Sequence, residues 1–411
     1  MTEPATTAVC RICDGAVTRF LDLGRQPLSD GFLAGPPSGD EYFYHLAVGM
    51  CGECTMVQLM QEVPRELMFH EDYPYYSSGS SVMREHFAGT ARRFLETELL
   101  GPDPFIVEIG SNDGIMLGTI KDAGVRHLGF EPSGQVGATA RASGIRVRTA
   151  FFEEATAREV RATEGPADVI YAANTICHIP YLSSIFRGVD ALLAANGVFV
   201  FEDPYLGDIL AKTSFDQIYD EHFFLFAARS VQQAARHFGF ELVDVERLAV
   251  HGGEVRYTIA RVGAREPSVN LAQLLAEEDA RGLTDPGNLA RFATAVGRIR
   301  TDLVALLEKL RAENKRVVGY GATAKSATVT NFCGISTDLV EWVSDSTPAK
   351  QGRLTPGAHL PVRPPADFAA DYPDHALLFA WNHATEIMAK ERAFRDAGGK
   401  WIVYVPEVRE I

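Results

Sequence analysis

Four of the six cysteines form two Cys-x-x-Cys pairs, Cys10 with Cys13 and Cys51 with Cys54. Each pair lies among turn residues, where a tight bend turns two sulfurs to the same side, and two such pairs can supply the four thiolates of a tetrahedral zinc site. Four cysteine ligands leave no open coordination position, so the predicted role of the metal is structural. The alternatives are four unrelated buried thiols or a redox dithiol, and two matched pairs in a loop-rich segment disfavour both.

A glycine-rich turn follows the apolar segment 105–109 and precedes a helical segment. The end of the apolar segment and the turn contain, in order, Glu108, Gly110, Asn112, Asp113 and Gly114. These glycines have GxxxG spacing instead of the GxGxxG of a dinucleotide-binding turn, and the two carboxylates favour a cationic ligand over a pyrophosphate. Glu131 follows about twenty residues later, at the end of the next predicted strand, where a carboxylate can accept hydrogen bonds from both hydroxyls of a ribose. A tight turn that binds no ligand is the alternative.

The segment Tyr219-Asp220-Glu221-His222 lies among aromatic residues. A histidine beside two carboxylates in such surroundings is a candidate general base that could remove a proton from carbon. A carbon-bound proton is acidic enough only beside a carbonyl group, and the resulting enolate oxygen needs a hydrogen-bond donor, for which Tyr219 is a candidate. The alternative is the start of a surface helix, with Asp220 and Glu221 as capping residues and His222 as a packing residue.

Two further segments, 71–80 and 319–326, are candidates for binding a polar substrate. The loop 71–80 is rich in hydroxyl groups, and Tyr76 and Ser78 are its candidate substrate contacts. A linker that only packs between domains is the alternative. Which of Tyr73, Tyr75 and Tyr76 faces the substrate stays open.

A second glycine turn, Gly319-Tyr-Gly-Ala-Thr-Ala-Lys-Ser326, follows the apolar segment that begins at Arg316. Backbone amides at a helix start, with Thr323, Lys325 and Ser326, form a reasonable seat for a diphosphate. The turn is not a P-loop, because GxxxxGK[ST] is absent. A Rossmann-type turn that only packs is the alternative.

The elements that must position these residues fall into three blocks, as 411 residues suggest at about 150 residues per domain. Residues 1–75 are interrupted by glycines and prolines, so we expect an irregular block that lacks an apolar core and depends on zinc. Residues 76–265 alternate apolar runs with helix-period segments, which predicts a parallel sheet. Residues 266–411 begin with helices and continue as another α/β unit.

The predicted sheet of the middle block has four apolar runs and a terminal antiparallel hairpin. The runs are 105–109, 127–131, 168–172 and 197–202, and the hairpin strands are 240–248 and 254–260. In the last block, leucines at helical spacing predict a helix over 288–314, and apolar segments predict strands at 316–320, 376–381 and 401–405. The predicted fold class is therefore α/β.

Composition restricts the partners. Hydrophobic residues at 46% and charged residues at 23% are typical of a globular protein, and 39 basic against 54 acidic residues give a net charge of −15. That charge disfavours nucleic acid and anionic lipid, which are both polyanions. Since there is no cationic leader followed by an apolar stretch and no run of about 18 apolar residues, a cytoplasmic location is expected.

The first glycine turn followed by Glu131 resembles motif I and the post-I acid of class I S-adenosylmethionine (SAM) methyltransferases. That resemblance implies SAM as cofactor. It also places Asn174 and His178, which follow the fourth strand of the central sheet, at the pocket of the sulfonium group. For His178, a purely structural role is the alternative.

The chain as a whole resembles the three-domain deoxysugar C-methyltransferases of antibiotic biosynthesis. The likeness rests on both cysteine pairs and on VEIGSNDG, YPYYSSGSS, FEDPYLGD, YDEHFFLF and GYGATAKSATVTNF. It is strongest to the 3-C-methyltransferases that act on dTDP-3-amino-2,3,6-trideoxy-4-keto-D-glucose on the way to nitrosugars such as tetronitrose. The family implies a class I SAM-methyltransferase domain of Rossmann-like fold between a small N-terminal zinc-binding domain and a C-terminal Rossmann-like domain.

The resemblance also implies roles for residues. His222 would take the C-3 proton, with Tyr219, Glu221 and Tyr73 as active-site neighbours, and the enolate would attack the SAM methyl group. The substrate would be a dTDP-linked ketosugar held among the three domains, and the chain is expected to act as a monomer. C-5 or N-methylation of a related sugar, a zinc-bearing binding module with a vestigial SAM fold, and a zinc-ribbon nucleic-acid binder are the alternatives.

Overall fold

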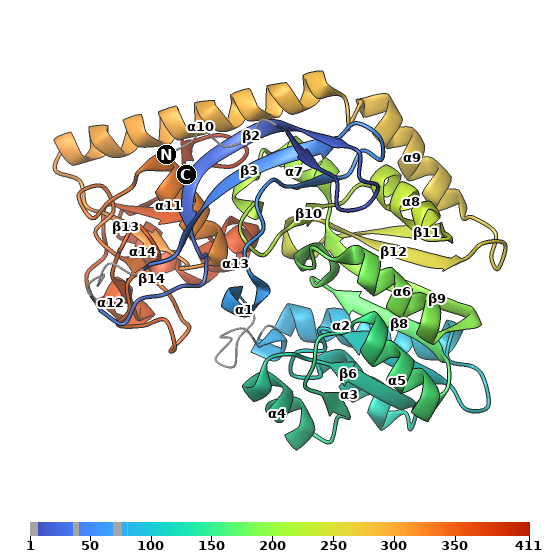
Figure 1. Cartoon of the computed structure of the whole chain (residues 1–411). Helices are drawn as coiled ribbons and strands as arrows, with labels where there is room; N and C mark the ends of the chain where they lie inside the picture. The colour runs from blue at the N-terminus through green and yellow to red at the C-terminus, as the bar shows by residue number, and fades with distance from the viewer. Residues whose placement is uncertain (1–6, 36–40, 69–75, 80) are drawn as a thin grey trace.

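A computed structural model of the chain describes residues 7–35, 41–68, 76–79 and 81–411. The described chain contains three sheets, and a long helix, α10 (Pro286–Ala312), runs across the molecule above the first of them (Figure 1). In α10, the Asp285 carboxylate accepts a hydrogen bond from the Gly287 backbone N–H at 2.7 Å, and Pro286 occupies the first turn. Buried residues at helical spacing, among them Val296, Leu303 and Leu307, face the rest of the protein.

The first sheet is antiparallel throughout and has the order β1-β2-β3-β4-β10. Its strands are β1 (Thr7–Val9), β2 (Ala16–Pro27), β3 (Phe43–Cys51), β4 (Val57–Leu59) and β10 (Phe224–Leu225). The expectation of an irregular N-terminal block without an apolar core is wrong. Leu46, Val48 and Leu59 are fully or almost fully buried, and β2 packs against α10 and α11 (Ala324–Cys333) from the far end of the chain.

Two of the glycine and proline interruptions that suggested irregular structure, Gly24 and Pro27, lie within β2. The pairing of β2 with β3 shifts register between Arg19 and Leu21 and again between Asp22 and Arg25. Gly24, in the second irregularity, has φ 74°, a conformation that glycine adopts without strain. The glycine therefore bends a long strand and does not end it.

The second sheet has the order β11-β12-β9-β8-β5-β6-β7. Its strands are β5 (Phe105–Ile109), β6 (Arg126–Phe130), β7 (Val147–Arg148), β8 (Ala167–Ala173), β9 (Leu193–Pro204), β11 (Phe240–Leu248) and β12 (Glu254–Arg261). The strands from β9 to β7 are parallel, and β12 runs antiparallel to both β9 and β11. The predicted parallel sheet with a terminal hairpin is confirmed.

Helices cover both faces of this sheet, as a doubly wound fold requires. Side chains alternate along β5, so Phe105, Val107 and Ile109 pack in one apolar cluster and Ile106 packs in the other. The first cluster includes residues of α5 (Glu154–Glu164), α6 (Leu182–Leu192) and α8 (Ala228–His237), and the second includes residues of α2 (Ser81–Thr97), α3 (Ile115–Asp122) and α4 (Gly134–Ala142). The helix α7 (Leu206–Lys212) follows β9.

The third sheet has the order β15-β14-β13-β16-β17-β18 and is parallel except for its last pair. Its strands are β13 (Val317–Tyr320), β14 (Val343–Ser344), β15 (Val362–Arg363), β16 (His375–Leu378), β17 (Lys400–Val403) and β18 (Arg409–Glu410). The helices beside it are α11, α12 (Pro365–Ala370), α13 (Ala384–Lys390) and α14 (Arg392–Asp396), and α9 (Val269–Arg281) precedes α10. This sheet matches the predicted C-terminal Rossmann-like unit.

No helix in the described ranges is both long and apolar enough to cross a bilayer.

Candidate active site

A cavity of about 470 Å³ is lined by residues of all three parts of the chain. Its lining comes from the carboxyl ends of β5, β6 and β8, from residues 219–222, and from the loops after β13 and β14, and it includes Asp30 of the N-terminal part. Between β5 and β8 the strand order of the second sheet reverses direction, which is where open α/β sheets bind ligands. The cavity is therefore the candidate active site.

The loop after β5 is tied to the acidic residue after β6. The Glu131 carboxylate accepts hydrogen bonds from the backbone N–H groups of Asn112 at 3.0 Å and Ser133 at 2.8 Å. Burial raises the pKa of Glu131, and these two N–H groups act in the opposite direction. At Gly110, φ is 69° and a β-carbon would collide with the Thr175 side chain, so only glycine lets the loop pass this point.

The predicted cofactor residues divide into two groups. Gly110, Asn112, Glu131, Asn174 and His178 line the cavity. Glu108, Asp113 and Gly114 are buried outside the cavity lining. Asp113 accepts a hydrogen bond from the Ser78 backbone N–H at 3.2 Å, and burial raises the pKa of Glu108 well above its ordinary value. The expectation that these two carboxylates face a cationic ligand therefore does not fit, since they support the loop from behind.

Sequence reasoning missed an aromatic wall that ends in a residue of the N-terminal part. The Arg65 guanidinium lies 4.2 Å from the ring centroid of Phe151 and 4.8 Å from that of Tyr181, and it forms an ion pair with Glu153 at 2.7 Å. Arg65, Phe151 and Tyr181 all line the cavity. Phe151 comes after β7, and β7 is the neighbour of β6, the strand that Glu131 follows. The only sequence signal was the pair Phe151-Phe152 after a short strand.

The candidate base has a defined tautomer. His222 Nδ1 lies 2.6 Å from the Gln217 carbonyl oxygen, which can only accept, so Nδ1 carries the proton. His222 Nε2 then accepts a hydrogen bond from the Tyr219 hydroxyl at 2.7 Å. Burial, with a smaller contribution from His178, lowers the pKa of His222 well below its ordinary value, so the ring is neutral at pH 7. A neutral imidazole with an unprotonated Nε2 is the state that a general base requires.

The Tyr219 hydroxyl is not placed as its predicted role requires. Its hydroxyl donates to the base nitrogen in this structure, whereas we expected it to donate to an enolate oxygen. Removal of a substrate proton by Nε2 requires this hydroxyl to turn aside, or to pass its own proton to Nε2 and take the substrate proton in its place. Glu221 also lines the cavity and is buried.

Of the hydroxyl-rich loop, the structure describes residues 76–79. Tyr73 lies outside the described residues. Tyr76 is 39% exposed, and neither it nor Ser78 lines the cavity, whereas Ser77 does. The Ser77 backbone N–H donates to the Asn112 side chain at 3.0 Å, so this loop contacts the glycine turn after β5.

Cys177, His178 and His222 bring their ligand atoms within 4.8 Å of one another, which raises the question of a second metal site. The two imidazole rings stack, with centroids 5.2 Å apart and planes 21° apart. Nitrogen lone pairs lie in the ring planes, so two nearly parallel rings do not direct them to one point. The pair is better described as a stacked imidazole wall of the cavity.

The C-terminal part of the chain contributes one wall of the cavity, which is built around the second glycine turn. Thr323 and Lys325 line the cavity, whereas Ser326 is buried and donates its hydroxyl to the Thr323 carbonyl at 2.6 Å. Among the described residues, the Thr323 hydroxyl has no hydrogen-bond partner. Lys350 donates to the Ala322 carbonyl at 3.0 Å. Lys350 is also in an ion pair with Asp30 at 3.3 Å, so Lys325 and the Thr323 hydroxyl at the start of α11 are the groups that suit an anion.

Asp345, which follows β14, repeats the arrangement of Glu131 in the second sheet. Its carboxylate accepts hydrogen bonds from the backbone N–H groups of Ala322 and Thr347, each at 2.7 Å. Both acids thus follow the second strand of a Rossmann-like unit, hold the glycine turn after its first strand and line the cavity. Sequence analysis did not identify Asp345, although its position after a short apolar segment was a usable signal.

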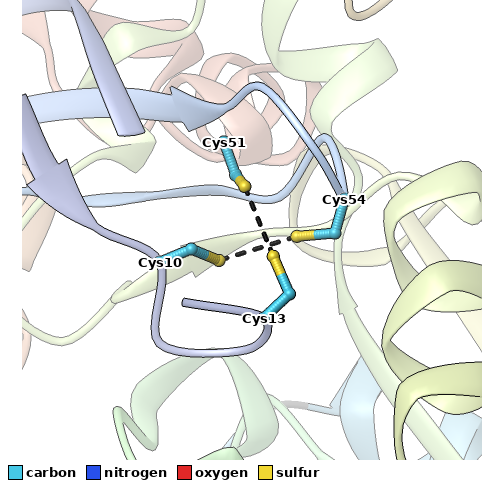
Figure 2. Close-up of side chains that lie close together, drawn as sticks. All are labelled: Cys10, Cys13, Cys51 and Cys54. Carbon is cyan, nitrogen blue, oxygen red and sulfur yellow. Dashed lines mark hydrogen bonds between the residues drawn. The ribbon is translucent and has the colours of Figure 1, made fainter. Parts of the chain in front are cut away.

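The four cysteines point toward one another at one end of the first sheet (Figure 2). Their sulfurs all lie within 4.8 Å, with Cys10 and Cys54 3.6 Å apart and Cys13 and Cys51 3.5 Å apart. Sulfur ligands of a tetrahedral zinc ion at about 2.3 Å are about 3.8 Å apart, so the cluster fits zinc.

The two cysteine turns have the same local structure. In each, the backbone N–H two residues after the first cysteine, Ile12 or Glu53, points at that cysteine's sulfur at 3.4 Å. The residue after the second cysteine, Asp14 or Thr55, is left-handed with φ near 60°. A hydrogen bond from the Cys54 thiol lowers the pKa of Cys10 to about 5, and the same contact raises the pKa of Cys54, so Cys10 is the thiolate of this pair.

The strand order of the second sheet, the glycine loop and Glu131 define a class I SAM-dependent methyltransferase. Three family models match the chain: "Putative zinc binding domain" over residues 10–69, "Methyltransferase domain" over 83–245 and "C-methyltransferase C-terminal domain" over 249–406. The sequence is also 32% identical to C-methyltransferase NovU from Streptomyces niveus over 407 residues, 98% of this chain and 96% of that protein. The chain therefore belongs to the deoxysugar C-methyltransferase family that its motifs resemble.

Solved methyltransferase structures align with less than half of the chain. A SAM-dependent methyltransferase from Anabaena variabilis covers 42% of this chain and 84% of its own at 17% identity, with a TM-score of 0.34. Magnesium protoporphyrin IX methyltransferase from Synechocystis with bound SAM covers 43% and 79% at 10% identity, with a TM-score of 0.32. At such scores these alignments add nothing to the family assignment.

Proposed function

We propose that the enzyme transfers the methyl group of SAM to C-3 of a dTDP-linked 4-keto-3-amino deoxysugar. The observation that carries this proposal is that one cavity is lined by a neutral, buried His222, by the glycine loop with Glu131, and by Thr323 and Lys325. A base that removes a proton from carbon is needed only where the methyl acceptor is a carbon atom. A 4-keto group makes the neighbouring C-3 proton acidic enough to be removed. Its relation to a C-methyltransferase supports the same acceptor.

In the proposed reaction, the C-3 proton passes to His222 Nε2, directly or through the Tyr219 hydroxyl, and the electron pair enters the enolate. Bound SAM supplies an electrophilic methyl group. The enolate carbon forms the new C–C bond as the S–CH₃ bond breaks, and S-adenosylhomocysteine and the methylated sugar are the products. Of the chain's own groups, Glu131 would hold the ribose hydroxyls of SAM, and Thr323 with Lys325 would hold the diphosphate of the sugar nucleotide.

We also propose that residues 1–75, 76–265 and 266–411 are the three domains. The three sheets support this division, although β10 of the middle segment pairs with β4 in the first sheet. A cytoplasmic location and action as a monomer remain predictions from the sequence.

The test is an assay with SAM and a panel of dTDP-4-ketosugars with and without a 3-amino group, followed by mass spectrometry. We expect a gain of one methyl group on the 3-amino substrate and, in deuterated water without SAM, exchange of its C-3 proton. Exchange at C-5 instead would assign the related C-5 reaction. Methylation without any carbon exchange would indicate N-methylation and contradict the proposal.

Arg65→Ala is expected to weaken SAM binding about three- to tenfold, the range of one partly buried cation–π contact. The physical reason is that Arg65 holds the aromatic wall beside Glu131, where an adenine ring next to the ribose would stack. Calorimetric titration with SAM measures the change. Arg158→Ala is the control, because this arginine of α5 is 66% exposed at its side chain and, among the described residues, pairs with Glu154 alone. Equal affinities in the two variants would show that the wall does not contact SAM.

A further inference from the structure

We propose that side chains of the C-terminal Rossmann-like unit position the catalytic base. They do so by hydrogen bonds to residues 214–222, the segment that ends in His222. This inference rests on the proposed role of His222 as the base. It assigns to the C-terminal unit a part in proton transfer in addition to holding substrate.

The segment has little regular structure of its own. Its described secondary structure is one short 3₁₀ helix, Phe215–Gln217, between α7 and β10. Within it, the Gln217 carbonyl accepts the His222 Nδ1 proton at 2.6 Å and so sets the rotation of the ring. Any displacement of the Gln217 backbone therefore displaces the basic nitrogen Nε2 on the opposite side of that ring.

The two residues that flank Gln217 are both bonded to the C-terminal unit. On one side, a single carboxylate oxygen of Asp216 accepts hydrogen bonds from Trp381 Nε1 and from the Tyr404 hydroxyl, each at 2.6 Å. On the other side, the Thr328 hydroxyl of α11 donates to the Ile218 carbonyl at 2.9 Å.

These contacts are buried and remote in sequence. Asp216 and Tyr404 are fully buried, and Thr328 is 2% exposed. Each bond joins residues more than a hundred positions apart. Thr328, Tyr404 and Asp216 do not line the cavity. The charge of Asp216 also acts on Lys325, so the residues suited to testing the segment itself are Thr328 and Tyr404, whose hydroxyls bond to it.

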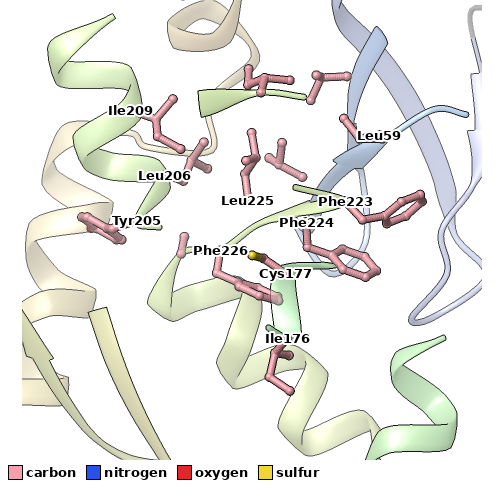
Figure 3. Close-up of a cluster of buried hydrophobic side chains, with 14 of the residues drawn as sticks. Leu59, Ile176, Cys177, Tyr205, Leu206, Ile209, Phe223, Phe224, Leu225 and Phe226 are labelled. Atoms are coloured by element: carbon pink, nitrogen blue, oxygen red, sulfur yellow. The ribbon is translucent and has the colours of Figure 1, made fainter. Parts of the chain in front are cut away.

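The other end of the segment is held by the N-terminal sheet. Directly after His222, the Phe223 carbonyl accepts the Leu59 backbone N–H at 2.9 Å, and β10 continues as the neighbour of β4. Figure 3 shows Phe223 to Phe226 packed with Leu59 and with Cys177. The Asp220 carboxylate also accepts the Ser29 backbone N–H at 3.0 Å. The base therefore lies between two anchors, and the C-terminal one is next to the carbonyl that orients it.

Thr328→Val tests the proposal, with Thr330→Val as its matched control. Both threonines lie on α11 and are almost fully buried. Within the described part of the chain, however, the Thr330 hydroxyl bonds to carbonyls of its own helix alone, Ser326 at 2.8 Å and Ala327 at 3.3 Å. We expect Thr328→Val to lower kcat and the rate of C-3 proton exchange about 10- to 100-fold, the cost of a small misplacement of a catalytic group, with KM for the sugar and Kd for SAM unchanged. Thr330→Val is expected to match the wild type in both rates.

A second readout needs no substrate. In ¹⁵N-histidine-labelled full-length enzyme, the hydrogen-bonded Nδ1 proton of His222 gives an NMR signal, which is assigned by its loss in His222→Phe. We expect this signal to shift or to exchange faster with water in Thr328→Val and to stay in place in Thr330→Val. Tyr404→Phe removes one of the two bonds to Asp216, and it takes the place of Thr328→Val if that variant does not fold.

The proposal is overturned if Thr328→Val and Tyr404→Phe both have the exchange rate and the His222 signal of Thr330→Val. Failure of the proposed function would look different. In that case His222 variants would keep wild-type turnover, and the His222 signal would still report whether α11 positions the ring.

Discussion

His222→Asn is expected to lower the rate of methyl transfer by roughly a hundred- to ten-thousandfold, the usual contribution of a general base. Asparagine can keep the hydrogen bond to the Gln217 carbonyl through its amide N–H, but it has no counterpart of the basic Nε2. The substitution therefore removes the base and retains the local contact. A radiolabelled-methyl assay measures transfer, and deuterium exchange at C-3 measures the proton step by itself.

SAM affinity is expected to change less than about twofold in the same variant, because the predicted contacts of the cofactor are with the loop after β5, Glu131, Asn174 and His178, and not with His222 itself. His237→Asn is the control, since this histidine is exposed at the end of α8. If His222→Asn turned over at the rate of His237→Asn, His222 would not be the base and the proposed mechanism would fall.

The pH dependence of the wild-type enzyme follows from the same residue. Only the unprotonated ring can accept a proton, so kcat/KM rises as the pH increases through the pKa of His222. Burial places that pKa well below the ordinary 6.5, so we expect kcat/KM to be flat from about pH 6.5 to 8 and to fall only in more acidic solution. A profile of kcat/KM between about pH 5 and 8 tests this. A midpoint at or above 6.5 would show that the titrating base is a more exposed group.

Loss of the zinc site is expected to have the largest effect on stability. In Cys54→Ser, we expect the zinc content to fall from about one ion per chain to well below one, and the free energy of unfolding to fall by at least about 3 kcal/mol, because metal-binding free energy is folding free energy. One cysteine turn connects β1 to β2 and the other connects β3 to β4. Loss of the metal therefore frees one end of the first sheet. Metal analysis and thermal unfolding measure the two quantities.

Cys333→Ser is the matched control, because Cys333 is 5% exposed and lies outside the cluster. We expect it to keep the zinc ion and to lose about 1 kcal/mol or less. The first sheet buries its own apolar side chains against α10 and α11, so Cys54→Ser is expected to destabilise the protein and not to unfold it completely. Full zinc content in Cys54→Ser, with stability equal to that of Cys333→Ser, would mean that the cluster does not bind the metal.

The comparison of β5 with β2 shows which parts of the fold could be predicted. Every residue of β5 is buried, and the run of apolar side chains that ends at a glycine turn identified the strand and its loop correctly. In β2, exposed and buried positions are mixed and Gly24 bends the chain, so short windows of sequence resemble loop. The apolar side of β2 becomes visible only because α10 and α11 cover it, and those helices follow it by more than 250 residues.

The same contrast applies to the active site. The two cysteine pairs, the loop around Gly110 and the segment ending in His222 are local patterns, because turn geometry and ligand chemistry act over a few residues. The sequence by itself therefore determined the family, the cofactor and the α/β architecture. Tertiary packing decided that Glu108 lies behind the loop, that Arg65 joins the cavity wall and that Thr328 holds the strand-free segment before His222. Each of these contacts depends on how whole sheets and helices pack, and no short sequence window contains both partners.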